Sequence, residues 1–158
     1  MRILGIDPGL RLTGYGVVDY QLRRPALVDG GVIRLNDKLP IPKRLVELEA
    51  ELESVVEEHR PEVVAVEQLY SHYAHPRTAI LMGHARGVIL LVAQRRGLRV
   101  EEFAANRIKK SVTGHGHASK PQIQRTIQSI WNLKDPPEPP DVADALAIAL
   151  CCGMASQG

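Results

Sequence analysis

Residues 3–9 read Ile3-Leu4-Gly5-Ile6-Asp7-Pro8-Gly9, a short apolar run that ends in a carboxylate and then turns on proline and glycine. A continuous apolar run of this length is typical of a strand buried in the centre of a sheet. Pro8 and Gly9 predict that this strand stops directly after Asp7. Open α/β sheets place their chemistry at such strand ends. We therefore expect Asp7 to face a cleft, although this stretch alone is equally compatible with a turn aspartate that caps a local N–H.

The size and composition of the chain fit one ordinary globular domain. With 158 residues, 44% of them hydrophobic and 24% charged, we expect a single domain over residues 1–158. Its two cysteines, Cys151 and Cys152, are adjacent and cannot form a disulfide framework, which favours a reducing compartment. No apolar stretch approaches the roughly 18 residues of a membrane span, and no basic leader precedes the first strand. We expect a cytoplasmic protein with no membrane partner.

The segments that follow the first strand predict a mixed sheet. Residues 12–20 and 26–35 are rich in β-forming residues and read as two further strands of an antiparallel meander. Residues 41–59 have helical periodicity, and Pro61 ends that helix. The next strand, residues 62–67, ends in Glu67. A helix between strands implies that this strand runs parallel to the first, so Glu67 should lie at the same sheet end as Asp7.

The second half of the chain supplies one more strand and several helices. Residues 76–96 form the most apolar helix, which must bury two faces, and residues 98–103 are a fifth strand. Residues 109–116 look like a basic, glycine-bearing turn. Ser119 and Gln122 have the spacing of a capping box that opens a helix to about Trp131. A last helix runs over residues 141–154, which completes an α/β fold of five mixed strands flanked by helices.

Four carboxylates have settings that point to chemistry. Asp7 and Glu67 end apolar strands, whereas Asp141 and Asp144 are three residues apart at a helix start and share one face. Acidic side chains on a helix that packs on a sheet need a cationic partner. Hard divalent ions prefer such oxygen ligands, Mg²⁺ first and Mn²⁺ as a substitute, and two of them would balance four negative charges. The alternative is that Asp141 and Asp144 only favour the helix N-terminus and that Glu67 is a surface residue.

Five segments match a known family in order along the chain: Gly5-Ile6-Asp7-Pro8-Gly9, Thr13-Gly14-Tyr15-Gly16, Ala65-Val66-Glu67-Gln68, Gly83-His84-Ala85-Arg86-Gly87, and residues 141–149 with Asp141 and Asp144. Together they resemble the RuvC family, which are bacterial Holliday-junction resolvases with a ribonuclease-H-like fold. Sugar kinases and actin relatives open with a similar Gly-x-Asp-x-Gly, but they need a much longer, two-lobed chain.

The resemblance implies a metal-dependent endonuclease of recombination and repair that makes paired cuts in four-way DNA junctions. It implies two metal ions held by catalytic ligands at Asp7, Glu67, Asp141 and Asp144. It also implies DNA contacts: Tyr70 matches an aromatic residue that stacks on bases, Lys109 and Lys120 match basic residues near the scissile phosphate, and Arg77 is a further candidate. Implied partners are a second copy of the chain and the RuvA–RuvB branch-migration complex. The histidines at positions 72, 75, 115 and 117 depart from the family pattern, so sequence preference at the cut can differ.

Two other activities and one surface remain open from the sequence. The chain can be a ribonuclease-H-like nuclease acting on RNA, or a junction-binding protein without catalysis; the Asp-x-x-Asp of the last helix favours the resolvase. For a twofold dimer we expect the helix 76–96 to offer either the stripe Leu81, Ala85, Val88 and Val92 or the stripe beside it, with Gly83 and Gly87 permitting close approach. The alternative is that both stripes are buried within one chain.

Overall fold

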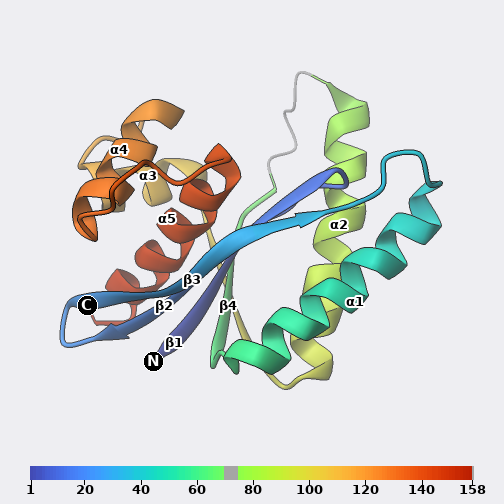
Figure 1. Ribbon diagram of the computed structural model, residues 1–158, viewed down its shortest axis with the longest axis horizontal. Coiled ribbons are helices and arrows are strands. Elements are labelled where there is room, and N and C mark those ends of the chain that lie inside the picture. Colours follow the sequence, from blue (N-terminus) through green and yellow to red (C-terminus); the bar gives the residue numbers. More distant parts are fainter. Residues whose placement is uncertain (70–74, 158) are drawn as a thin grey trace.

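The computed structural model describes residues 1–69 and 75–157. A five-stranded sheet in the order β3-β2-β1-β4-β5 forms its centre, with β1, β2 and β3 antiparallel and with β4 and β5 parallel to β1. Helices α1 and α2 cover one face and helices α3, α4 and α5 the other (Figure 1). The elements are β1 Arg2–Asp7, β2 Leu12–Gln21, β3 Arg24–Arg34, α1 Ile41–His59, β4 Val63–Glu67, α2 Pro76–Arg95, β5 Arg99–Phe103, α3 Ala105–Thr113, α4 Lys120–Ile130 and α5 Pro140–Ala155.

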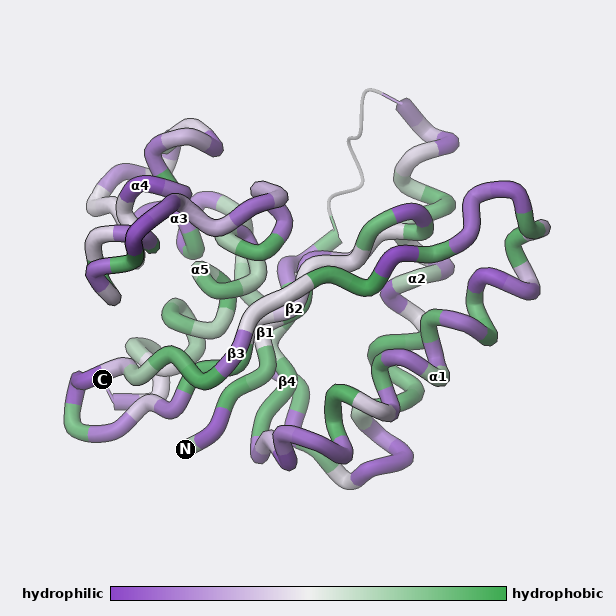
Figure 2. The backbone as a smooth tube through the Cα atoms, viewed as in Figure 1, coloured by the Kyte–Doolittle hydropathy of each residue, from purple (hydrophilic) through white to green (hydrophobic). Residues whose placement is uncertain are grey.

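This arrangement confirms the predicted mixed sheet flanked by helices. Strand β1 lies in the middle because its apolar side chains alternate between the two layers: Ile3 joins the cluster under α5, whereas Leu4 and Ile6 join the cluster under α1 and α2. The tube in Figure 2 is hydrophobic along β1 and β4, where helices cover both faces. No helix of the described ranges is long and apolar enough to cross a membrane.

Gly5 sets the distance between β1 and the helix above it. A Cβ built on Gly5 would lie 2.1 Å from the backbone oxygen of Ala145, a contact that no side chain can make. Helix α5 therefore rests directly on the backbone of β1, and its alanines are completely buried there. This close docking requires the small residues that both segments carry.

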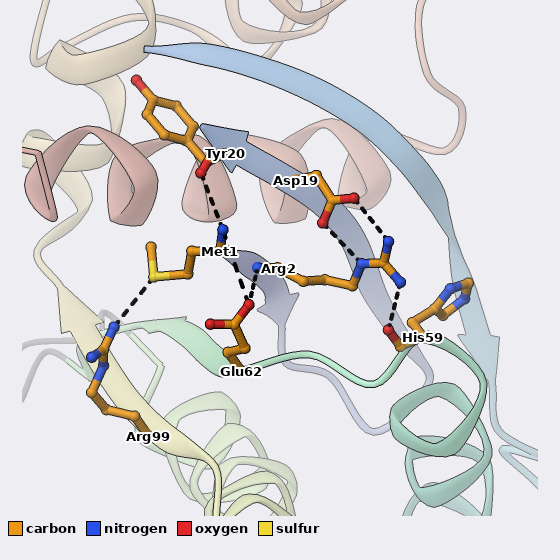
Figure 3. Close-up of polar contacts among 7 residues, drawn as sticks. All are labelled: Met1, Arg2, Asp19, Tyr20, His59, Glu62 and Arg99. Atoms are coloured by element: carbon orange, nitrogen blue, oxygen red, sulfur yellow. Dashed lines mark hydrogen bonds and ion pairs between the residues drawn. The ribbon is translucent and has the colours of Figure 1, made fainter. Parts of the chain in front are cut away.

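A polar network fastens the end of the sheet at which β1 begins (Figure 3). The guanidinium of Arg2 donates to both oxygens of Asp19 at 2.9 and 2.8 Å, and to the backbone oxygen of His59 at 2.9 Å. The Arg2 backbone N–H donates to Glu62 Oε1 at 3.0 Å. Because these contacts tie β1, β2 and the entry to β4 together, the amino end of the sheet is closed by its own side chains, and Asp7 lies at the opposite end.

The prediction of a turn over residues 109–116 was wrong. Residues 109–113 belong to helix α3, which ends at Gly114 with a left-handed φ of 81°. Ile108 is buried and Val112 packs against the same core cluster, four residues along one helix face. The basic and polar residues between them, Lys109, Lys110 and Ser111, made this short apolar stripe hard to see in the sequence. Lys109 is therefore carried by a helix rather than by a loop.

The two apolar stripes of α2 have different surroundings. Ala85 and Val92 are fully buried and Leu81 and Val88 pack on the same core cluster, so this stripe, which we named as a possible partner surface, faces inward. The stripe beside it is open, since Ile80 is 62% and Leu91 46% exposed. The alternative that both stripes are buried within one chain is therefore wrong for the outer one.

The capping box predicted before α4 is present. Gln122 donates its backbone N–H to Ser119 Oγ at 3.3 Å, and the backbone N–H of Ser119 donates to Gln122 Oε1 at 2.7 Å. We expect Ser119→Ala to lower the free energy of unfolding by about 1 kcal/mol, because one helix N–H loses its acceptor. Urea unfolding measures this change. Ser54→Ala on the exposed face of α1 is the control and should change stability by less than half as much.

Candidate active site

Two of the predicted acids lie on neighbouring strand ends. Strands β1 and β4 are parallel, and their register pairs Ile6 with Val66. Asp7 and Glu67 are the next residues and the last of their strands, so both leave the sheet at its carboxyl end. The structure thereby confirms that the two carboxylates share one end of the sheet, as expected for an active site in an α/β fold.

Helix α5 brings the other two acids to the same end. Gly14 of β2 pairs with Asp7, and a Cβ built on Gly14 would lie 2.2 Å from the backbone oxygen of Asp141. The amino end of α5 therefore lies on the ends of β1 and β2. The rest of the helix, from Val142 to Gly153, is buried except for Asp144, which is partly exposed. An apolar helix thus carries a carboxylate to the rim of the sheet.

One pocket collects most of the predicted residues. Asp7, Glu67 and Asp144 line it together with Lys109 and Lys120, which come from α3 and α4. Asp141 does not line this pocket, but it is close enough for its charge to act on Asp7 and Asp144. These residues come from five elements, β1, β4, α3, α4 and α5, and span the chain from residue 7 to residue 144, which explains why no short motif describes the site.

The carboxylates destabilise one another's charges. Burial, and then the charges of Asp144 and Asp141, raise the pKa of Asp7 to about 7. Burial raises the pKa of Glu67, with a further contribution from the charge of Asp144. The pKa of Asp144 is raised by burial, although the Lys120 ammonium acts in the opposite direction. Three partly buried acids with raised pKa values form a site that a cation stabilises.

Lys120 supplies one positive charge to this cluster. Its Nζ lies 3.2 Å from Asp144 Oδ2. Burial acts to lower the pKa of Lys120, but the charges of Asp144, Asp7 and Asp141 hold that pKa above its ordinary value. The first turn of α4, fixed by its capping box, therefore places an ammonium group between the carboxylates and solvent. Lys120 comes from another helix than Asp144, so their pairing could not be predicted from neighbouring positions in the sequence.

The chemistry of these donors fits hard divalent cations. All four groups are carboxylates, the ligands that Mg²⁺ and Mn²⁺ prefer, and the raised pKa values of Asp7, Glu67 and Asp144 reflect charge that such ions would neutralise. As the side chains stand, no three His, Cys, Asp or Glu residues in the described part of the chain are close enough to hold one ion together. The prediction that all four acids are metal ligands therefore rests on their donor chemistry, on the pocket that Asp7, Glu67 and Asp144 share, and on the position of Asp141 beside it.

The remaining predicted DNA contacts have different outcomes. Lys109 lines the pocket, whereas Arg77 is exposed on the first turn of α2 and does not line it. Tyr70 lies outside the described residues. Arg86, for which we predicted no role from the sequence, lies buried in the wall of the pocket and faces Glu67 and Glu102. A charged residue within the apolar stripe of α2 was the signal that could have identified it.

The chain is similar to known proteins over nearly its whole length. The family model described as crossover junction endodeoxyribonuclease RuvC matches residues 3–152. A curated protein of that name from Rhodopirellula baltica is 50% identical over 149 residues, covering 94% of this chain and 84% of the relative. A second, from Pelotomaculum thermopropionicum, is 44% identical over 151 residues, covering 96% and 92%.

A solved structure has the same fold. The RuvC structure from Thermus thermophilus matches with a TM-score of 0.88 at 34% identity, covering 100% of this chain and 97% of the other. The same protein in complex with a Holliday junction substrate matches with a TM-score of 0.90, again at 34% identity, covering 100% and 96%. The backbone described above is therefore similar to one that has been observed on a four-way junction.

Proposed function

Because this chain belongs to the RuvC family of crossover junction endodeoxyribonucleases, we propose that the pocket at the carboxyl ends of β1 and β4 is where it cuts DNA. The protein is a ribonuclease-H-like, Holliday junction resolving endonuclease of DNA recombination and repair. The observation that carries the proposed site is the meeting of Asp7, Glu67 and Asp144 with Lys120 in one pocket, from two strands and two helices.

Each group in the pocket has a role that its position supports. The Asp7 and Glu67 carboxylates are fixed on strand ends and Asp144 on a buried helix, so they are oriented before DNA arrives. Lys120 presents an ammonium group that can meet a phosphate oxygen, and Lys109 adds positive charge to the same wall. DNA affinity comes mainly from such basic contacts to phosphate. Arg77 and Tyr70 stay candidate DNA contacts in this proposal.

The protein is a metal-dependent nuclease, and we propose Mg²⁺ as its metal, with Mn²⁺ as a substitute. Asp7, Glu67, Asp141 and Asp144 are the proposed ligands. Two ions are the number that neutralises four carboxylates. When bound, the metal would supply charge neutralisation on the phosphate and activation of the attacking water.

A cleavage assay tests this function directly. A synthetic four-way junction is incubated with the protein and Mg²⁺ or Mn²⁺, and the positions of the cuts are mapped on all four strands. We expect paired cuts on opposing strands of the junction and little cutting of a linear duplex or a structured RNA of the same length. Faster cleavage of the RNA would favour a ribonuclease, and binding without cleavage in any metal would favour a non-catalytic junction binder.

We propose that the working unit is a symmetric homodimer. Resolution of a four-way junction needs two incisions on opposing strands, whereas each chain supplies one acidic pocket. The outer face of α2 offers a second copy the exposed apolar side chains of Ile80 and Leu91, with His84 and Gly87 between them. The RuvA–RuvB branch-migration complex is a further proposed partner, on the basis of family membership alone.

Gly87→Glu should separate the two copies. A Cβ on Gly87 meets no heavy atom within 4 Å in the protomer, so a glutamate can be accommodated there without disturbing the fold of one chain. At an apolar twofold interface, the glutamate introduced at position 87 of one protomer would lie opposite the same glutamate of the other, and the two buried charges would repel each other. We expect a folded monomer by sedimentation at micromolar concentration, which nicks junctions but rarely makes paired cuts.

Ser54→Glu on the exposed face of α1 is the control for the added charge and should leave dimers and paired cuts unchanged. Unmodified protein that sediments as a monomer and still makes paired cuts would contradict the dimer proposal.

A further inference from the structure

Arg86 of α2 is a buried arginine in the wall of the proposed active site. Its side chain is 11% exposed and lines the same pocket as Asp7, Glu67 and Asp144. Its Nε donates to the backbone oxygen of Glu67 at 3.4 Å, and one of its terminal nitrogens lies 2.7 Å from Glu102 Oε2 of β5. A buried guanidinium is costly unless it is paired, so its position beside a catalytic strand end requires an explanation.

The Glu67 carbonyl lacks the backbone partner that a parallel sheet would normally give it. The Gln68 N–H donates to Phe103 of β5, and successive residues of a strand direct their polar groups to opposite neighbours, so the Glu67 carbonyl faces β1. The register that pairs Ile6 with Val66 places Pro8 opposite this carbonyl. Proline has no N–H, and therefore the donor that would close the ladder is missing. Arg86 donates to the oxygen that Pro8 leaves without a partner.

We infer that Arg86 is a positioning residue, which clamps the end of β4 so that the Glu67 carboxylate is held where it binds metal. This inference rests on the proposed function of the pocket. The Glu67 side chain alternates to the face of α5, with Ala65 and Val63 in the cluster under that helix, whereas Arg86 approaches from α2 on the opposite face. Arg86 therefore acts on the backbone of Glu67, and its ion pair with Glu102 ties this strand end to β5.

The clamp opposes a specific force. The charges of Glu67 and Asp144 repel each other in a partly buried site, and β4 ends at Glu67, with no further pairing to β1 beyond Val66 in the described residues. Without a fixed backbone, the Glu67 carboxylate can relax toward solvent and away from Asp144. Groups that orient metal ligands in this way typically change metal affinity by about 10–100-fold when they are removed.

Metal titration without DNA tests the inference. Calorimetry of the full chain with Mn²⁺ should give a dissociation constant for Arg86→Gln about 10–100-fold weaker than for the unmodified protein. Arg86→Lys keeps the positive charge but has only one donor nitrogen, so its dissociation constant for Mn²⁺ should lie between those of Arg86→Gln and the unmodified protein. Junction affinity in EDTA should stay within about twofold, because Arg86 acts on Glu67 rather than on phosphate. Glu102→Gln removes the charge of this ion pair but keeps an oxygen acceptor for Arg86, so it should weaken Mn²⁺ binding less than Arg86→Gln does.

A second substitution distinguishes positioning from general structural damage. Pro8→Ala returns the backbone N–H that the Glu67 carbonyl lacks, so Arg86→Gln combined with Pro8→Ala should recover part of the lost Mn²⁺ affinity. Equal Mn²⁺ affinity in Arg86→Gln and the unmodified protein, no recovery in the double variant, or a large loss of junction affinity in EDTA would each overturn the inference. If the unmodified protein itself binds no Mn²⁺, the proposed metal site fails rather than the clamp.

Discussion

Asp144→Asn is expected to reduce junction cleavage by at least about 10²–10³-fold while junction binding stays within about threefold. The substitution preserves the shape of the side chain and removes the charge that lies 3.2 Å from Lys120 Nζ and acts on Glu67. Cleavage needs that charge in the proposed metal site, whereas binding depends mainly on basic contacts to phosphate. The same result is expected for Asp7→Asn, Glu67→Gln and Asp141→Asn.

Single-turnover cleavage of a labelled junction in Mg²⁺ measures the first effect, and gel-shift titration in Ca²⁺ or EDTA measures the second. Asp135→Asn, in the exposed segment before α5, is the matched control and should cleave at the normal rate. If one of the four variants cleaves at nearly the normal rate, that residue leaves the set of proposed ligands. Asp141 is the most informative of the four, because it lies beside the pocket rather than in its lining.

The sheet end of the active site could be predicted because it depends on local sequence. Apolar runs that stop at Asp7 and Glu67 define two strand ends, and a helix between the strands makes them parallel. Helix α5 was equally predictable, since a long apolar helix that carries an acid must bury one face on the sheet. From these three elements, the position of the carboxylates at one end of the sheet can be predicted without any knowledge of distant contacts.

The cationic side of the site could not be predicted in the same way. Lys120 reaches Asp144 from another helix, and Arg86 compensates for a missing N–H at Pro8, which lies 78 positions earlier in a chain of 158 residues. Both contacts arise from packing between segments far apart in the sequence, so no local sequence pattern predicts them. The outer stripe of α2 is a related case: periodicity shows that two stripes exist, but only the packing shows that Val92 faces inward and Leu91 outward.

The repulsion among the acids has a consequence for stability in the absence of metal. The folded protein raises the pKa of Asp7 from 3.8 to about 7, so between about pH 4 and pH 7 the folded state holds a proton that the unfolded state has released. The free energy of unfolding of the metal-free protein therefore falls as pH rises through this window. A shift of about three units corresponds to roughly 4 kcal/mol above pH 7, as an upper bound for this one group.

Asp7→Asn removes the charge and should therefore stabilise the metal-free protein while it abolishes cleavage. In EDTA at pH 8 we expect its melting temperature to exceed that of the unmodified protein by several degrees, up to about 10 °C. We expect little difference at about pH 3, below both pKa values, where Asp7 is mainly protonated in both states. Calorimetric melting at the two pH values measures the effect. Asp135→Asn is again the control and should not change the melting temperature.

Bound metal should reverse the order of the melting temperatures of the unmodified protein and Asp7→Asn. Mg²⁺ or Mn²⁺ bound by the acids would neutralise the repulsion only where the Asp7 carboxylate is present, so it should raise the melting temperature of the unmodified protein more than that of Asp7→Asn. A variant that melts below the unmodified protein in EDTA at pH 8 would mean that the Asp7 carboxylate makes a net favourable contact in the metal-free fold. The raised pKa values of Glu67 and Asp144 act in the same direction, so this site is built at the expense of metal-free stability.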